Sequence, residues 1–170
     1  MSDIISIYGT NVKLPPKPPL EEFLYYNLDK KEQKWTKTNL PKYFDKVQYQ
    51  KNGDLVLTLA QEQYAIKEVQ RCKNGVWAII GGKERYISGK YYFYLQYYTL
   101  EDGNSPDFRE ADRLYFLFLM YWENIDWCLG NIRTKKRRQG ASSQSCSNLL
   151  YEAIFYKNSN CGLISKTKED

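Results

Sequence analysis

Apolar residues recur at helical spacing between residues 109 and 126. Positions three or four apart carry large apolar side chains, which are Leu114, Leu117, Phe118, Tyr121 and Ile125. On an α-helix these positions share one face, so the spacing predicts an amphipathic helix with that face in the core.

A second helix is predicted for residues 59–72. Thr58 and Gln61 have the spacing of a capping box, in which Thr58 accepts a hydrogen bond from the amide three residues on and starts the helix. The apolar stripe of this helix consists of Leu59, Ile66 and Val69, with Ala65 and Cys72 beside it. We expect this stripe to lie in the core.

Residues 76–80 and 83–88 are two strand-like runs separated by Gly81-Gly82. A Gly-Gly pair is typical of a two-residue hairpin turn, because both residues tolerate positive φ. The following residues 91–98 are mostly aromatic and contain one amide side chain, Gln96. That amide either pairs with the edge of an adenine beside the rings or bonds a backbone group next to a packed aromatic core.

The C-terminal third predicts a strand, a loop and a helix in succession. Residues 126–132 have the composition of a strand, residues 133–145 form a basic loop that runs into small hydroxyl residues, and residues 146–155 predict a helix. A second strand is expected at residues 161–165. A right-handed crossover through the helix joins it to the first strand, so the two strands should be parallel. The predicted fold class is α/β, the beginning of a P-loop NTPase parallel sheet preceded by a helical and β-hairpin region.

The N-terminal residues predict a different organisation. Residues 1–19 end in Leu-Pro-Pro-Lys-Pro-Pro, which favours a stiff, extended arm outside the core. The arm is either a docking tail for another subunit or a flexible leader. A short helix is expected over residues 20–28. We divide the chain into an arm and lead-in at residues 1–40 and a domain portion at residues 41–170.

Composition narrows the function classes. The net charge is +5 and the basic excess lies mainly in residues 133–138, which indicates a polyanion site rather than a basic protein throughout. The chain has no histidine, so Ser-His and Cys-His nucleophile pairs are excluded. Its four cysteines form no C-x-x-C pair, and we expect them to be reduced, in the cytoplasm and without a structural zinc. Neither a signal peptide nor a membrane-spanning run is expected.

The loop at residues 133–145 has the chemistry of a phosphate site without the full motif. Against G-x-x-x-x-G-K-[ST], Lys135 stands at the first glycine, Gly140 matches the second, Ala141 replaces the lysine and Ser142 matches the hydroxyl residue. Gly140 allows close backbone approach, and Ser142 or Ser143 supplies a hydroxyl for magnesium. The cation must come from the residues before the glycine, which are Lys135, Lys136, Arg137 and Arg138. A solvated or nucleic-acid-contacting patch and a nuclear localisation signal are the alternatives.

Residues 137–143, with the sequence Arg-Arg-Gln-Gly-Ala-Ser-Ser, resemble the deviant Walker A loop of large terminase subunits. These are the ATP-driven motors that package DNA in tailed phages, and in them the lysine often moves to the first half of the loop. Residues 89–96, 115–118 and 161–167 are similar to segments of terminases from crAss-like phages. The resemblance covers about residues 40–170.

This resemblance implies ATP and Mg²⁺ as cofactors. It assigns the displaced Walker lysine to Lys135 or Lys136, the loop arginine to Arg137 or Arg138, and the magnesium ligand to Ser142 or Ser143. It also places Gln139, Gly140 and Ala141 in the nucleotide site and Gln96 beside the adenine.

The implied parent protein hydrolyses ATP to move DNA into a prohead in the host cytoplasm, as a ring oligomer with a portal protein, a small terminase subunit and DNA as partners. No second acidic strand end, coupling motif or nuclease domain follows within these 170 residues, so we expect weak nucleotide binding without ATP turnover. The rival interpretation is a non-enzymatic nucleic-acid-binding module, whose basic run contacts phosphates and whose tyrosines stack on bases.

Overall fold

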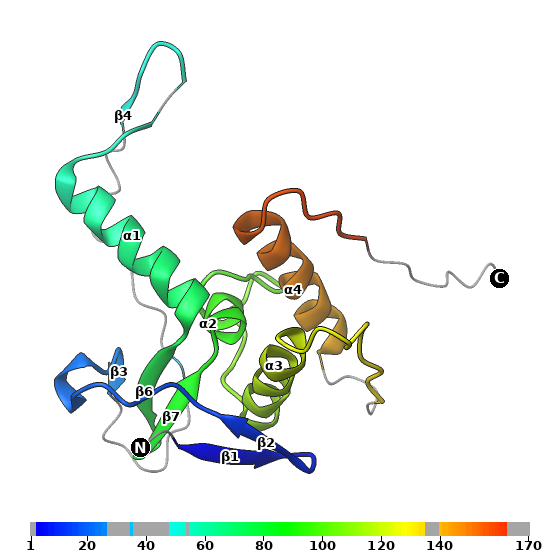
Figure 1. Cartoon of the computed structure of the whole chain (residues 1–170). Coiled ribbons are helices and arrows are strands. Elements are labelled where there is room, and N and C mark those ends of the chain that lie inside the picture. The colour runs from blue at the N-terminus through cyan, green and yellow to red at the C-terminus, as the bar shows by residue number, and fades with distance from the viewer. Residues whose placement is uncertain (1–2, 27–34, 36–47, 54, 135–139, 163–170) are drawn as a thin grey trace.

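The computed structural model describes residues 3–26, 35, 48–53, 55–134 and 140–162 and has a mixed α/β arrangement (Figure 1). The helices are α1 (Leu59–Asn74), α2 (Gly89–Gln96), α3 (Glu110–Glu123) and α4 (Ala141–Phe155), with a 3₁₀ turn, η1, at Leu20–Glu22. The strands are β1 (Ile4–Ile7), β2 (Thr10–Lys13), β3 (Tyr25–Tyr26), β4 (Gln48–Tyr49), β5 (Leu55–Val56), β6 (Val76–Ile80) and β7 (Lys83–Ile87). The α/β class expected from the sequence is confirmed, and the described strands form small separate sheets, β1-β2, β4-β5 and β3-β6-β7.

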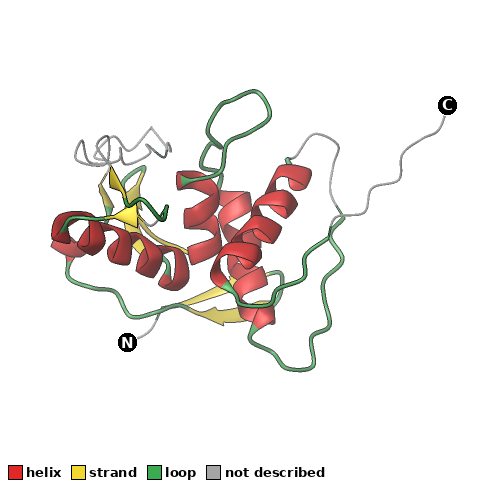
Figure 2. Cartoon of the chain, turned by 90° about the horizontal axis from the view of Figure 1, so that it is seen from above, coloured by secondary structure: helices red, strands yellow, loops and turns green. Residues whose placement is uncertain are grey.

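The core is built around α2, the aromatic stretch that follows the β6–β7 hairpin. Every residue of α2 is buried. A helix that is apolar nearly all round has no face for solvent and must be covered on all sides. The other three helices, α1, α3 and α4, each pack against it (Figure 2). The main core is completed by rings from outside α2, among them Trp35, Phe108, Phe116 and Tyr151.

The predicted hairpin at Gly81-Gly82 is confirmed. Strands β6 and β7 are antiparallel with Ile80 opposite Lys83, and both glycines have positive φ, 58° and 70°. Two successive positive-φ residues make a turn whose twist matches that of the flanking strands. Strand β3 adds to the other edge of β6 in parallel orientation, with Tyr25 opposite Ala78.

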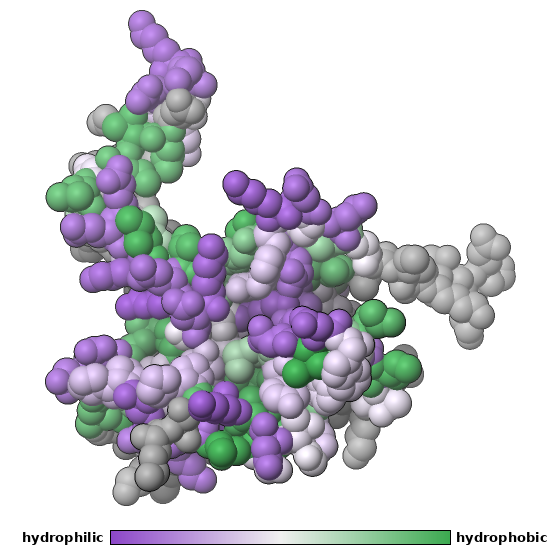
Figure 3. All heavy atoms as spheres, in the orientation of Figure 1, coloured by the Kyte–Doolittle hydropathy of each residue, from purple (hydrophilic) through white to green (hydrophobic). Residues whose placement is uncertain are grey.

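Helix α1 begins as predicted but buries a different face. The capping box is present, with Thr58 accepting from the Gln61 amide and the Gln61 side chain accepting from the Thr58 amide. The expected core stripe is wrong: Leu59, Ile66 and Val69 are 70%, 57% and 43% exposed. Figure 3 shows hydrophobic side chains at the surface of the segment that carries α1. The buried residues of α1 are Gln61, Glu68 and Cys72, because α2 packs against that side.

The N-terminal residues are part of the core, so the expectation of an extended arm is wrong for residues 4–14. Strands β1 and β2 pair as an antiparallel hairpin. Its inward side chains, Ile7, Val12 and Leu14, form a second hydrophobic cluster with Trp77, Tyr86 and Leu117. Alternation of apolar and polar residues from position 4 to position 14 is the signal of a half-buried hairpin. In place of the helix expected at residues 20–28, residues 20–26 form η1 and β3, and residues 27 and 28 lie outside the described residues.

The helix predicted for residues 109–126 is present as α3, which covers Glu110–Glu123, but the strand expected at residues 126–132 is wrong. These residues form a turn and then irregular chain. Leu129 and Ile132 are fully exposed, at 101% and 98%, and Trp127 is 73% exposed. A strand requires a neighbour for its backbone N–H and C=O groups, and in the described part of the chain none lies alongside. At the second expected strand, Cys161 and Gly162 are irregular and residues 163–165 lie outside the described residues.

Among the described helices, none is long and apolar enough to cross a membrane.

Buried groups around α2 make stability fall in alkali. Burial raises the pKa values of Tyr86 and Tyr94 to about 12. Burial lowers the pKa of Lys90, but ion pairs with Glu123 and Glu152 outweigh it, so that pKa is raised. Each group binds its proton more tightly when folded, so its contribution is complete below the unfolded pKa values of roughly 10 and is lost as the pH rises toward 12.

Burial also raises the pKa of the Cys72 thiol to about 12, from an unfolded value of roughly 8.5. We therefore expect the free energy of unfolding from urea titrations to be flat between about pH 6 and 8 and to fall progressively above about pH 9. Replacing Tyr86 by phenylalanine should make the fall shallower, because one buried hydroxyl no longer ionises. An unchanged free energy up to about pH 11 would contradict the role given to these groups.

Candidate phosphate site at the start of α4

The loop that follows Arg133 ends at Gly140, where α4 begins. Gly140 is the N-cap residue and has left-handed backbone angles, φ 70° and ψ 16°, which glycine adopts without a steric cost. It has no side chain with which to cap, so the amides of the first turn find no side-chain acceptor on the cap residue. A helix start of this kind favours the binding of anions, because the free amide N–H groups and the positive end of the helix dipole both face a ligand placed there. The helix predicted for residues 146–155 is present but begins earlier, at Ala141, so residues 141–145 belong to α4 and not to the loop.

Arg109, at the start of α3, lies against Gly140. A Cβ added to Gly140 would lie 3.2 Å from Nη2 of Arg109. The guanidinium donates to the buried carboxylate of Asp112 through Nε and Nη2, at 2.7 Å each. The hydroxyl of Tyr91 accepts from the Arg109 amide at 2.9 Å and donates to its carbonyl at 3.0 Å. Arg109 is therefore fixed at its backbone and its side chain, with its charge at the start of α4.

Arg133, the last basic residue described before Gly140, brings a second guanidinium to the same region. Its guanidinium carbon lies 3.7 Å from the centre of the Tyr115 ring, which is a cation–π contact. It also donates to Oε1 of Gln144, a side chain that is 1% exposed. The Nε2 of Gln144 has no hydrogen-bond partner among the described residues.

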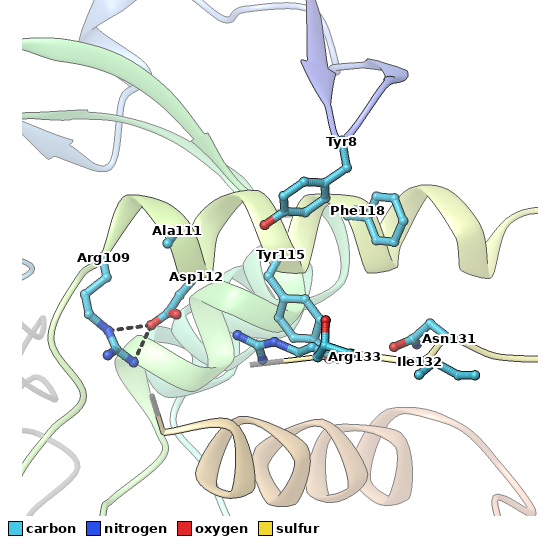
Figure 4. A pocket seen from close by; sticks show the side chains of 10 residues that line it. Tyr8, Arg109, Ala111, Asp112, Tyr115, Phe118, Asn131, Ile132 and Arg133 are labelled. Carbon is cyan, nitrogen blue, oxygen red and sulfur yellow. Dashed lines mark hydrogen bonds and ion pairs between the residues drawn. The ribbon is translucent and has the colours of Figure 1, made fainter. Parts of the chain in front are cut away.

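Arg109, Asp112, Tyr115 and Arg133 line a cavity of about 480 Å³ between α3, the β1–β2 turn and the chain before α4 (Figure 4). One end carries Arg109 and Asp112, Tyr115 and Arg133 form the middle, and Phe118 and Asn131 lie at the other end, with Tyr8 above (Figure 4). The full lining is Tyr8, Arg109, Ala111, Asp112, Tyr115, Phe118, Asn131, Ile132, Arg133 and Thr134. The cavity therefore has the Arg109–Asp112 ion pair at one end, the Arg133 guanidinium in the middle and aromatic rings at the other end.

The structure brings together only part of the predicted site. Ala141, Ser142 and Ser143 form the first turn of α4 next to Gly140, with Ala141 buried and Ser142 exposed. Lys135, Lys136, Arg137, Arg138 and Gln139 lie outside the described residues.

Gln96 does not join this region. It is the last residue of α2, is 7% exposed and does not line the cavity. Its burial within an aromatic helix agrees with the alternative in which the amide serves the packed core.

Sequence reasoning missed Arg109 and Asp112. Their spacing of three residues at a predicted helix start is a weak signal of an ion pair. Nothing local shows that this pair meets a glycine 31 positions further along the chain. Within the described residues there is no cluster of acidic residues and cysteines able to hold a metal ion by itself.

Comparisons with protein-family models, with curated proteins and with solved structures give no match to this chain.

Proposed function

We propose that this chain is the N-terminal ATP-binding part of a viral large terminase, the motor that hydrolyses ATP to package DNA into proheads. The observation that carries the proposal is the start of α4, where Gly140 has a left-handed conformation and a Cβ added to it would lie 3.2 Å from Nη2 of Arg109. A glycine, a helix start and a fixed cation are three of the parts that a phosphate loop needs. The resemblance of residues 137–143 to a deviant Walker A loop supports the same assignment.

In this proposal ATP binds with Mg²⁺, its phosphates at the first turn of α4 and the metal at Ser142 or Ser143. Lys135 or Lys136 acts as the displaced Walker lysine, and Arg137 or Arg138 as the loop arginine. Arg109 adds a cation that the motif does not contain, which lessens the cost of having Ala141 at the usual lysine position. The finer fold that we propose is the beginning of a P-loop NTPase parallel sheet.

The parent motor acts in the host cytoplasm as a ring oligomer, with DNA, a portal protein and a small terminase subunit as its partners. These assignments rest on the resemblance alone. For the chain of 170 residues by itself we propose nucleotide binding without turnover.

The second candidate is a nucleic-acid-binding module that uses the basic residues 133–138. Within α2, Tyr91, Tyr92 and Tyr94 are at most 2% exposed and have no face for a base, so base stacking in this module falls to exposed tyrosines such as Tyr8, Tyr49 and Tyr156. A phosphate-contacting basic run remains, and strong salt dependence would mark its binding to DNA.

Replacing Gly140 by valine is expected to abolish the binding of a fluorescent ATP analogue with Mg²⁺, which means that its affinity falls by a factor of roughly a hundred or more. The β-branched residue is strained at positive φ, and its side chain meets Nη2 of Arg109. Gly53→Val is the matched control, because Gly53 also has positive φ, 87°, but has open space around it in the β4–β5 turn. Fluorescence titrations of the wild type and both variants measure the effect.

Since Gly140→Val also strains the start of α4, Arg109→Gln provides a second variant that leaves this backbone unchanged. It should weaken nucleotide binding by about tenfold, as expected for a lost charge-assisted hydrogen bond. If both variants bind nucleotide as the wild type does, or if the wild type shows only salt-sensitive DNA binding, the phosphate-loop assignment is wrong.

A further inference from the structure

Tyr8 occupies an unusual backbone position at the tip of the β1–β2 hairpin. Its φ is 49°, and the next residue, Gly9, has φ 81°. Turns with two positive φ angles favour asparagine or glycine at the first position, whereas a bulky residue there is strained. Burial of the Tyr8 side chain does not offset this strain, because the residue is 72% exposed. Neither folding of the turn nor core packing accounts for a tyrosine here.

The ring of Tyr8 is nevertheless placed by a specific contact. It meets the ring of Phe118 edge to face, with centroids 5.5 Å apart and an interplanar angle of 79°. Both rings line the cavity described above, and Figure 4 shows Tyr8 over α3 with Phe118 beside it. The hairpin therefore holds an exposed aromatic face at the mouth of a cavity that also contains arginines.

The two ends of the cavity are separated by a length that suits a nucleotide. Arg109 and Phe118 are nine residues apart along α3, which corresponds to about 13 Å along a helix axis. Between them Arg133 lies over Tyr115 and adds a second guanidinium to that of Arg109. Asn131, at the aromatic end, carries an amide that can donate to and accept from a base edge. A ligand with an aromatic group at one end and phosphates at the other matches this order.

We propose that the Tyr8–Phe118 end of the cavity is the base subsite of the nucleotide, with the phosphates directed toward Arg109 and Gly140. The proposal rests on the nucleotide-binding function given above and replaces Gln96 as the base contact. The base stacks on the ring of Tyr8, Asn131 faces its edge, and Arg133 lies between base and phosphates. Stacking on one ring tolerates any base, so the subsite recognises nucleotides as a class and adenine only through Asn131.

The test compares two ligands on the full chain by calorimetry: ATP, and inorganic tripolyphosphate, which has the phosphates without the base. The variant is Tyr8→Asn, which removes the ring while supplying a residue that tolerates positive φ. Tyr49→Asn is the matched control, because Tyr49 is 71% exposed but lies in β4, outside the cavity. We expect Tyr8→Asn to weaken ATP binding by about tenfold, with tripolyphosphate binding and the Tyr49 variant unchanged.

Each other result overturns the base subsite. If Tyr8→Asn binds ATP as tightly as the wild type, the base lies elsewhere although the phosphate site stands. If Tyr8→Asn weakens the binding of ATP and of tripolyphosphate by the same factor, Tyr8 acts on the phosphates or on the fold. If the wild type binds neither ligand, the proposed function fails and the base subsite fails with it.

Discussion

Replacing Gly89 by alanine is expected to lower the free energy of unfolding by about 3 kcal/mol or more, the upper part of the range for overpacked sites. A Cβ at this position would lie 1.8 Å from the carbonyl oxygen and 2.7 Å from the carbonyl carbon of Cys72. Both atoms belong to the backbone of α1, so no side-chain rotation relieves the overlap. Gly89 is the first residue of α2, and α1 can move away only by opening the core.

Thermal and urea denaturation followed by circular dichroism measure this loss, which corresponds to a fall in Tm of roughly 10 °C for a domain of this size. Gly103→Ala is the control. Gly103 has open space around it, so an alanine there would be strained only by the positive φ of 80°. It should cost about 1 kcal/mol. Equal melting temperatures for wild type and Gly89→Ala would mean that α1 and α2 do not approach this closely.

Replacing Glu68 by alanine is expected to cost about 3 kcal/mol, as when one partner of a buried ionic network is removed. The Glu68 side chain is 7% exposed. Its Oε2 accepts from the Tyr92 hydroxyl at 2.8 Å and from the Tyr97 hydroxyl, and its Oε1 accepts from Arg71. Without the carboxylate, the buried hydroxyl of Tyr92 and the half-buried guanidinium of Arg71 lose a shared acceptor, and unpaired buried polar groups are costly.

Glu62→Ala provides the comparison within α1, because Glu62 is exposed and its loss should cost less than about 0.5 kcal/mol. Glu68→Gln keeps an acceptor oxygen and should fall between the two. The free energies of unfolding come from urea titrations. If Glu68→Ala is no worse than Glu62→Ala, the carboxylate is not an organising group between α1 and α2.

Local rules predicted those elements whose signals lie within a few residues. The capping box at Thr58, the Gly81-Gly82 turn and the apolar spacing in residues 109–126 each specify backbone geometry without reference to distant residues. A helix after the basic run was predicted in the same way, although at residues 146–155 and not from Ala141. The strand expected at residues 126–132 does not belong with these elements, because pairing needs a second chain segment that composition cannot provide.

Burial was decided by the tertiary structure. Leu59, Ile66 and Val69 have the spacing of a core stripe, yet α2 meets α1 on the side of Glu68 and Cys72. The apolar pattern fixes that a face exists, but the arrival of Gly89 and Tyr92 at the end of α1 fixes which face is covered. The carboxylate is accepted there because two tyrosine hydroxyls and an arginine satisfy it.

The candidate site divides in the same way. The sequence by itself determined that a glycine preceded by basic residues opens a helix, since both facts are local. Only the tertiary structure placed Arg109 with Asp112 against that glycine and the Tyr8 ring over the same cavity, because these contacts join segments from three distant parts of the chain. Contacts of that kind depend on how α3 packs beside α4 and the β1–β2 hairpin, which no short stretch of sequence encodes.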